Sequence, residues 1–299
     1  MPGVSQTRAY VALLLIVLLW ASYPAATKLA LEAFPPFFLA AVRCAVASAF
    51  LVALLARSGR DAVRGLTPVA WRPFLILGVT GIWGSTQFTY LAIYHTTASN
   101  AVILQAATPV VVALGAWVYL RERLPMLGWL GVAASAFGVL LVITDGRLLA
   151  LRREDLRPGD LLTLLCLIAW SAYTVYGKRV LAAASPGLAT TAAYVLGTVL
   201  ILPTALFAAP FFAPPRLGSA TAWAVAFYQG IAGAVAHVWW YRAVHVVGPS
   251  RSAIFMNVQP VVGVLLAALL LGERVGVWDV AGGALVLAGV ALTTRARTR

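Results

Sequence analysis

The stretch ATPVVVALGAWVYLRERLP occupies residues 107–125, and a related stretch, VQPVVGVLLAALLLGERVG, occupies residues 258–276. Each contains a proline, two valines and an apolar run that leads to Glu-Arg. Aligned without gaps at an offset of 151, residues 109–141 are identical to the second copy at 13 of 33 positions. Composition alone would give only about three or four identities in a chain so rich in Ala, Leu and Val. The chain therefore contains an internal duplication.

The composition excludes a soluble globular fold. Of the 299 residues, 62% are hydrophobic and 10% are charged, whereas soluble domains carry about 25% charged residues. The net charge of +13 comes largely from Lys and Arg at the ends of apolar runs, as the positive-inside rule requires of membrane proteins. We therefore expect the lipid bilayer to be the main partner and expect no nucleic acid. The two cysteines, Cys44 and Cys166, lack metal-ligand spacing, so no metal and no cofactor is predicted.

Hydropathy predicts an all-α polytopic membrane protein, because a helix needs about 20 apolar residues to cross a bilayer. Ten segments qualify, at residues 9–28, 36–56, 73–94, 98–120, 126–144, 160–180, 188–209, 221–245, 250–271 and 276–294. The duplication divides them into a first five-helix repeat (1–144), a connecting loop (145–159) and a second five-helix repeat (160–299). Because five is odd, the second repeat must enter the membrane from the opposite side, and the repeats are inverted.

The first span also resembles a signal peptide in its charge and apolar run. However, WASYPAATK at residues 20–28 matches the internal WSAYTVYGK at residues 170–178, at an offset of 150. We therefore expect the first span to be retained. With an internal N-terminus, thirteen Lys and Arg fall at cytoplasmic ends of the spans and six at the opposite ends. This bias predicts that both termini are cytoplasmic.

At these motifs the chain resembles the EamA-type members of the drug/metabolite transporter superfamily. The resemblance covers nearly the whole chain and rests on WASYPAATK, on AVILQAATPVVVALGAWVYLRERL with the following GWLGVAASAFGVLLVI, and on their second-half copies. It implies a ten-helix exporter of small metabolites, often amino acids, in the inner (plasma) membrane. These motifs are structural and say little about the substrate, and no pattern sets an oligomeric state.

Polar and aromatic side chains inside spans are candidates for a solute pathway. The candidates for substrate binding are Trp20, Tyr23, Trp83, Gln87, Tyr90, Tyr94, Gln105, Trp170, Tyr173, His237, Tyr241 and Asn257. In the third span, four of them follow steps of 4, 3 and 4 residues and predict one helical face. The 151-residue offset relates Tyr90 to Tyr241, so the polar faces correspond across the repeat. An interfacial aromatic belt is the alternative for those near span ends.

The other candidate residues also have explanations that do not involve solute binding. Trp20, Tyr23, Trp170 and Tyr173 occupy equivalent places in the two halves and offer flat walls with one donor each, although plain helix packing would also explain them. The amides of Gln105, Asn257 and Gln259 lie near prolines that free backbone carbonyls, and these groups bind solute or each other. Arg43 lies inside the second span and either holds a substrate carboxylate or extends toward the interface.

These features favour a secondary transporter that moves small metabolites, amino acids foremost, out of the cell by alternating access; export of drugs or other metabolites is the nearest alternative. A membrane enzyme would require a nucleophile–base pair or paired carboxylates. A channel would require a ring of charged residues or a filter of backbone carbonyls, and a primary pump would require a nucleotide-binding motif. The sequence has none of these patterns. Because no acidic residue lies centrally in a span, we expect weak or no proton coupling, with His237 as the one candidate carrier.

Overall fold

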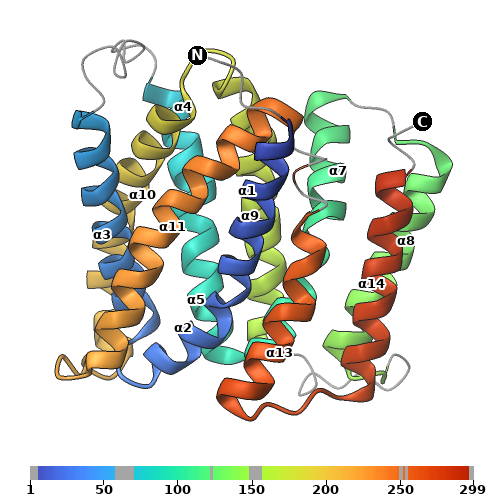
Figure 1. Ribbon diagram of the computed structural model, residues 1–299. Helices are drawn as coiled ribbons and strands as arrows, with labels where there is room; N and C mark the ends of the chain where they lie inside the picture. Colours follow the sequence, from blue (N-terminus) through green and yellow to red (C-terminus); the bar gives the residue numbers. More distant parts are fainter. Residues whose placement is uncertain are drawn as a thin grey trace.

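The computed structural model describes residues 6–57, 71–121, 124–147, 157–248, 252 and 255–295. All regular secondary structure in these ranges is helical. In chain order the elements are α1 Gln6–Ala21, α2 Tyr23–Leu31, α3 Pro36–Arg57, α4 Trp71–Leu77, η3 Gly78–Gly84, α5 Ser85–His95, α6 Ala98–Gln105, α7 Thr108–Leu120, α8 Met126–Thr144, α9 Pro158–Val180, α10 Pro186–Ala208, η5 Ala209–Phe211, α11 Ala220–Val247, η6 Phe255–Val258, α13 Gln259–Leu271 and α14 Val277–Arg295. Figure 1 shows them packed side by side as one bundle.

Local chemistry explains where several helices begin and end. The side chains of Thr97, Ser185 and Ser219 each accept a hydrogen bond from a backbone N–H three residues later and so cap α6, α10 and α11. At the other ends, α7 and α13 stop at Arg121 and Gly272, both in the left-handed conformation with φ of 54° and 64°. These two positions are equivalent through the 151-residue offset, so the two copies end their helices in the same way.

Six described helical segments are long and apolar enough to cross a membrane. They are Gln6–Leu31, Pro36–Arg57, Ala98–Leu120, Met126–Thr144, Pro158–Val180 and Pro186–Phe211, and two shorter apolar helices are Phe255–Leu271 and Val277–Thr293. The segments Trp71–His95 and Ala220–Val247 fall outside this set. Both carry the polar and aromatic side chains that the sequence points to as a solute pathway, and these lower their mean hydropathy.

Large apolar side chains cover the outside of the bundle. Leu206, Phe207 and Leu269 are 77%, 78% and 75% exposed, and many other Leu, Val, Phe and Trp side chains are more than one third exposed. A soluble monomer rarely exposes contiguous apolar surface on this scale. The outer surface is therefore suited to lipid, and the polar side chains are collected inside.

The interior has two main parts. The larger cluster of buried apolar side chains joins α1, α3, α9, α10 and α11, and a smaller one joins α6, α7, α8 and α14. In Figure 1, α8 and α14 lie together at one side of the bundle, and each is packed more closely against the other than against any other helix. The two clusters meet at α9, which contributes Trp170 and Tyr173 to the larger and Leu167 to the smaller, and the candidate site lies beside it.

Candidate functional site

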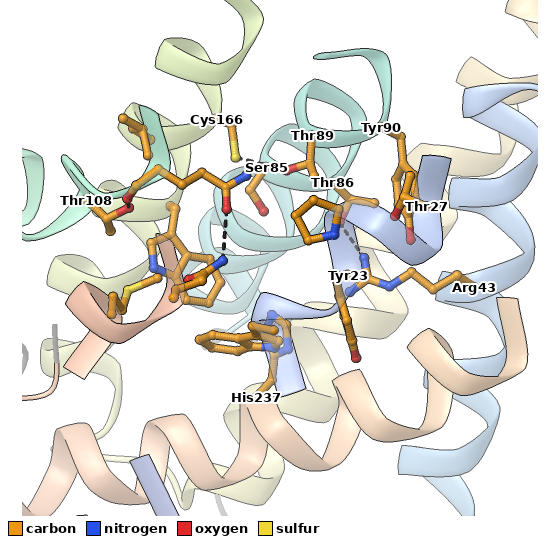
Figure 2. A pocket seen from close by; sticks show the side chains of 17 residues that line it. Tyr23, Thr27, Arg43, Ser85, Thr86, Thr89, Tyr90, Thr108, Cys166 and His237 are labelled. Carbon is orange, nitrogen blue, oxygen red and sulfur yellow. Dashed lines mark hydrogen bonds between the residues drawn. The ribbon is translucent and has the colours of Figure 1, made fainter. Parts of the chain in front are cut away.

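A cavity of about 120 Å³ lies inside the bundle and is lined by residues of both halves of the chain. Six of the sequence candidates line it: Trp20, Tyr23, Tyr90, Gln105, Trp170 and His237. The other polar residues in its wall are Thr27, Arg43, Ser85, Thr86, Thr89, Thr108, Cys166 and Gln259. None of the described lining residues is acidic. Figure 2 shows these side chains converging from several helices on one space.

Interrupted helices supply much of the cavity wall. The helical segment α1–α2 is interrupted at Ser22, and the segment α6–α7 is interrupted at residues 106–107. Helix α13 is preceded by the short 3-10 helix η6, Phe255–Val258. Pro24, Pro109 and Pro260 stand just after these breaks, where a proline needs no N–H partner. Trp20, Tyr23, Gln105, Thr108, Met256 and Gln259 flank the breaks and line the cavity. Irregular backbone is tolerated in a membrane protein where it lines a protected cavity.

Arg43 from α3 is the charged residue of the cavity wall. It is buried, with 6% of its surface exposed. Its NH1 donates to Thr86 Oγ1 at 3.2 Å and its NH2 to Tyr194 Oη at 3.1 Å. The Tyr90 ring centroid lies 5.9 Å from the guanidinium carbon. All of these partners are neutral, so the described contacts leave the positive charge uncompensated.

Tyr194 extends this network to His237. The His237 Nδ1 atom lies 3.1 Å from the Tyr194 hydroxyl and 2.8 Å from the Gly233 carbonyl oxygen. Because a carbonyl can only accept, the geometry assigns the ring hydrogen to Nδ1. His237 is thus held as a donor to the backbone of its own helix, within hydrogen-bond reach of the residue that binds Arg43.

Gln229 from α11 connects the other side of the wall. Its Oε1 accepts a short hydrogen bond from the Tyr90 hydroxyl, and its Nε2 donates to Thr27 Oγ1 at 2.9 Å and to the Tyr23 carbonyl at 3.2 Å. The Tyr23 hydroxyl in turn donates to the Gln229 carbonyl at 3.3 Å. Gln229 has 0% exposed surface. It therefore joins α2, α5 and α11 through one side chain.

Aromatic rings make up the remaining wall. The Trp20 ring lies 5.3 Å from that of Trp170 and 5.4 Å from that of His237, centroid to centroid and edge to face. Tyr173 and Tyr241 stack behind this group with centroids 4.7 Å apart. Both are fully buried but do not line the cavity. The Tyr173 ring also contacts the rings of Trp170 and His237, with centroids 5.2 and 6.1 Å apart.

The structure does not bring four other candidates to the cavity. Gln87 donates from Nε2 to Thr204 Oγ1 at 2.9 Å and so faces α10, and Tyr94 is 45% exposed beside Phe212. Trp83 packs against the larger apolar cluster, within the π-helical stretch η3. The 3.6-residue period used for the third span fails across η3, because a π-helix is wider. Asn257 lies next to the cavity residue Met256 without lining the cavity itself.

Two amides near the prolines bind each other. Gln259 Nε2 donates to Gln105 Oε1 at 3.1 Å, and the Gln105 carbonyl accepts from Thr108 Oγ1 at 2.5 Å. Of the two sequence alternatives for these amides, the structure contains the mutual pair. Both residues still line the cavity, so the pair forms one part of its wall.

A second polar network lies at the end of the bundle where α5 ends and α6 begins. Lys28 Nζ donates to the carbonyls of Ile93 and Thr96 at 2.9 and 2.8 Å, and Thr96 Oγ1 donates to Asp160 Oδ1 at 2.6 Å. The Glu273 carboxylate accepts from the backbone N–H groups of Ala98 and Ser99 at 2.9 and 2.8 Å. An anion at a helix N-terminus is favoured by the helix dipole. This network ties α2, α9 and the end of α13 to the α5–α6 junction.

Comparison of the sequence with models of protein families identifies the family of this chain. The model of the EamA-like transporter family matches residues 7–144 and again residues 157–295. The chain belongs to the EamA-like transporter family. This EamA-like transporter is 30% identical over 292 residues to an "Uncharacterized transporter" of Archaeoglobus fulgidus, covering 97% of this chain and 98% of that one. It is 25% identical to the "Uncharacterized inner membrane transporter YedA" of Escherichia coli K12, covering 94% and 89% of the two chains.

A solved structure gives the same fold. A crystal structure that is 21% identical covers 99% of both chains with a TM-score of 0.67. At this identity the likeness concerns the fold alone.

Sequence reasoning missed three polar residues that organise the site of this EamA-like transporter: Thr27, Tyr194 and Gln229. Tyr194 is a lone tyrosine in an apolar run, whereas Thr27 stands beside Lys28 and Gln229 beside Tyr228. Such patterns do not distinguish a network member from an interfacial residue. The one available signal came from comparing the two halves. Tyr194 follows directly after residue 193, which is the repeat equivalent of Arg43 at an offset of 150, and Tyr194 is hydrogen-bonded to Arg43.

Proposed function

We propose that this protein is a secondary transporter that moves small metabolites, amino acids foremost, out of the cell by alternating access of the central cavity. The observation that carries the proposal is an aromatic-lined cavity to which both halves contribute, at the breaks of their helices. In secondary transporters the solute site lies at the interface of two repeats and is formed by discontinuous helices. We propose Trp20, Tyr23, Tyr90, Gln105, Trp170 and His237, with Arg43, as the solute-binding residues.

Contacts between equivalent positions support an inverted repeat. Ser48 and Thr198, which are 150 residues apart, meet at 2.8 Å between their hydroxyl oxygens. The Trp20 and Trp170 rings, also 150 residues apart in sequence, are in edge-to-face contact. A residue that touches its own equivalent lies on a two-fold axis.

Contacts between α8 and α14, the last helix of each half, support the same two-fold relation, because each of two glycines in one helix contacts the repeat equivalent of the other. Gly131 approaches the Gly289 carbonyl and Gly138 approaches the Gly282 carbonyl, while the 151-residue offset pairs Gly131 with Gly282 and Gly138 with Gly289. Such reciprocal contacts are those of an isologous interface. A two-fold axis between halves that enter the membrane from opposite sides gives a transporter two matched gates.

The network of Lys28, Asp160 and Glu273 supports a closed gate at its end of the bundle. It joins helices of both halves through charged groups and backbone atoms. We propose that these contacts open when the solute leaves on this side. The repeat counterpart of Glu273 is Glu122, which lies outside the described residues.

We also propose that the protein is a multi-pass protein of the inner membrane with both termini cytoplasmic. The name of the Escherichia coli relative, which includes "inner membrane transporter", supports the location. Proton coupling is expected to be weak or absent, because none of the described acidic residues lines the cavity.

Flux in proteoliposomes tests the proposal. Vesicles containing the purified protein and loaded with unlabelled amino acids are expected to accumulate labelled amino acid by counterflow. Tyr90→Ala removes a cavity residue and is expected to lower this flux at least tenfold, whereas Tyr94→Ala, on the same helix but away from the cavity, leaves it unchanged. A channel would give flux without stimulation by solute on the opposite side. Absence of counterflow for amino acids, and for a panel of other small metabolites and cationic drugs, would refute the transporter proposal.

A further inference from the structure

Arg43 is a buried charge without a counter-charge among the described residues. Its hydrogen-bond partners are the hydroxyls of Thr86 and Tyr194, and its Nε–H, which is inaccessible to solvent, has no acceptor among the described residues. Guanidinium groups stay protonated in proteins. A buried unpaired charge is strongly unfavourable, and ionisable side chains inside membrane proteins mark solute or ion pathways. The protein therefore maintains a positive charge in the cavity wall at a cost to its own stability.

A second unpartnered donor lines the same cavity. The indole Nε1–H of Trp170 is buried and has no acceptor among the described residues. Trp170 is connected to Arg43 through His237, whose ring lies 5.4 Å from that of Trp170, and through Tyr194. Both unmatched groups are donors. Because neither N–H is accessible to solvent, neither contacts the cavity space directly; it is the charge of the cavity-lining Arg43 that favours a ligand with acceptor oxygens and a negative charge.

The size and lining of the cavity limit the rest of the ligand. A cavity of about 150 Å³ in another protein holds benzene, so the 120 Å³ here suits a ligand whose apolar part is no larger than benzene. The rings of Trp20, Trp170 and Tyr23 provide apolar walls for its remaining atoms. No described acidic residue lines the cavity, so an ammonium group on the ligand would have no ionic partner.

From these observations we propose that Arg43 binds the carboxylate of the transported solute, and that the cavity recognises small monocarboxylates with or without an amino group. Figure 2 shows the Arg43 side chain extending from its helix toward Tyr23 and Thr86, inside the ring of lining residues. The planar fork of a guanidinium matches a carboxylate with two parallel hydrogen bonds. This inference rests on the proposed transport function and names the chemical group that the same site selects.

Matched ligands test the proposal on the native protein. Thermal unfolding of the detergent-purified protein is measured with isovalerate, its neutral amide isovaleramide, valine and isobutylamine, and with the set benzoate, benzamide and benzylamine. Sodium chloride at equal concentration is the control for anions in general. We expect stabilisation by isovalerate or benzoate, an equal or smaller shift with valine, and none with the amides, the amines or chloride. Stabilisation by the amines or amides equal to that by the acids, or no stabilisation by any acid, would overturn the proposal.

Variants then assign the effect to Arg43. Arg43→Gln is expected to weaken carboxylate binding roughly tenfold to a hundredfold, the usual range for a charge-assisted hydrogen bond. Arg43→Lys keeps the positive charge but loses the planar fork, so its affinity for carboxylates is expected to lie between that of the native protein and that of Arg43→Gln. Arg242→Gln, which changes an exposed arginine of α11, is the matched control and leaves binding unchanged. Carboxylate binding that survives Arg43→Gln would contradict the assignment.

Stability without ligand separates binding from a structural role. If Arg43 serves the ligand, Arg43→Gln and Arg43→Met unfold at the same temperature as the native protein or higher, because an unpaired buried charge has been removed. If Arg43 instead holds the helices together, both variants unfold at lower temperature, and the proposal fails. Counterflow distinguishes this failure from that of the transport function. Flux of amines that is unchanged in Arg43→Gln would support transport and contradict carboxylate recognition. Carboxylate binding that depends on Arg43, without any flux, would support carboxylate recognition and contradict transport.

Discussion

At the scale of single residues, hydrogen bonds between helices hold the cavity wall in place. Gln229 makes three side-chain hydrogen bonds, to Tyr90, Thr27 and the Tyr23 backbone. Each ends on α2 or α5, so its loss would free polar groups of two other helices. Gln87 makes one described side-chain hydrogen bond, to Thr204. The two glutamines therefore differ in how much of the structure depends on them.

Gln229→Leu is expected to destabilise the protein by about 2 kcal/mol, since an interhelical hydrogen bond in a membrane protein contributes roughly 0.6 kcal/mol. Gln87→Leu, the matched control, is expected to cost less than half as much. Thermal unfolding of both variants in one detergent measures the difference. Equal stability of the two variants would show that the Gln229 network does not fix the cavity wall.

Gly81 shows how a single missing side chain makes room for an aromatic residue. A Cβ atom at Gly81 would overlap the ring of Tyr173, which stacks on Tyr241 behind the cavity. Gly81→Ala is therefore expected to lower the unfolding temperature and to weaken solute binding by displacing Tyr173. Gly187→Ala is the control, because nothing lies within 4 Å of its added Cβ. The prediction is wrong if the two alanine variants unfold at the same temperature.

The sequence predicted part of this residue-scale detail. Tyr90 and His237 were candidates because a polar residue deep in an apolar run marks a solute pathway, and both line the cavity; Trp20 also lines it, although helix packing was an equal alternative for this residue. Gln87 and Tyr94 could not be separated from Tyr90, because all three lie within α5 and their spacing of three and four residues places them on one broad face without showing which neighbour each side chain meets. Gln229 and Tyr194 depend on contacts between helices far apart in sequence, which periodicity does not contain.

At the scale of elements, prolines follow the breaks in α1–α2, α6–α7 and η6–α13. The sequence pointed to the prolines of the last two, whereas residues 9–28 were expected to form one uninterrupted span. The pairing of α8 with α14 depends on glycines of both helices. A Cβ at Gly138 would lie 2.6 Å from the Gly282 carbonyl oxygen, so the two backbones are in direct contact. Small residues at such interfaces let membrane helices approach closely.

Gly138→Ala is accordingly expected to force α8 and α14 apart and to destabilise the protein, because the opposing group is backbone and cannot rotate away. Gly283→Ala on α14 provides the comparison, since its Cβ would meet only a side-chain methyl of Ile103 at 3.3 Å. Unfolding temperatures in detergent report the difference. If Gly138→Ala unfolds at or above the temperature of Gly283→Ala, close backbone packing is not what holds this pair together.

At the scale of the whole molecule, the path of the chain agrees with the orientation that we propose from the Lys and Arg distribution. Figure 1 shows α1 beginning and α14 ending at the same end of the bundle. Arg57 ends α3 at that end as well, whereas α8 ends at the opposite end. The orientation relative to the cell comes from the sequence count of thirteen against six, because the fold alone does not distinguish inside from outside.

Reporter fusions test this orientation. A cytoplasmic reporter fused after Arg57 or after Arg295 is expected to be active, and one fused after Arg147, which follows α8, is expected to be silent. A second reporter that is active only outside the cytoplasm serves as the control and should give the opposite pattern at each site. Because each repeat must cross the membrane an odd number of times to be inverted, the fusions after Arg147 and Arg295 must report opposite sides. Activity of the same reporter at both sites would refute the inverted repeat, and with it the two matched gates on which alternating access depends.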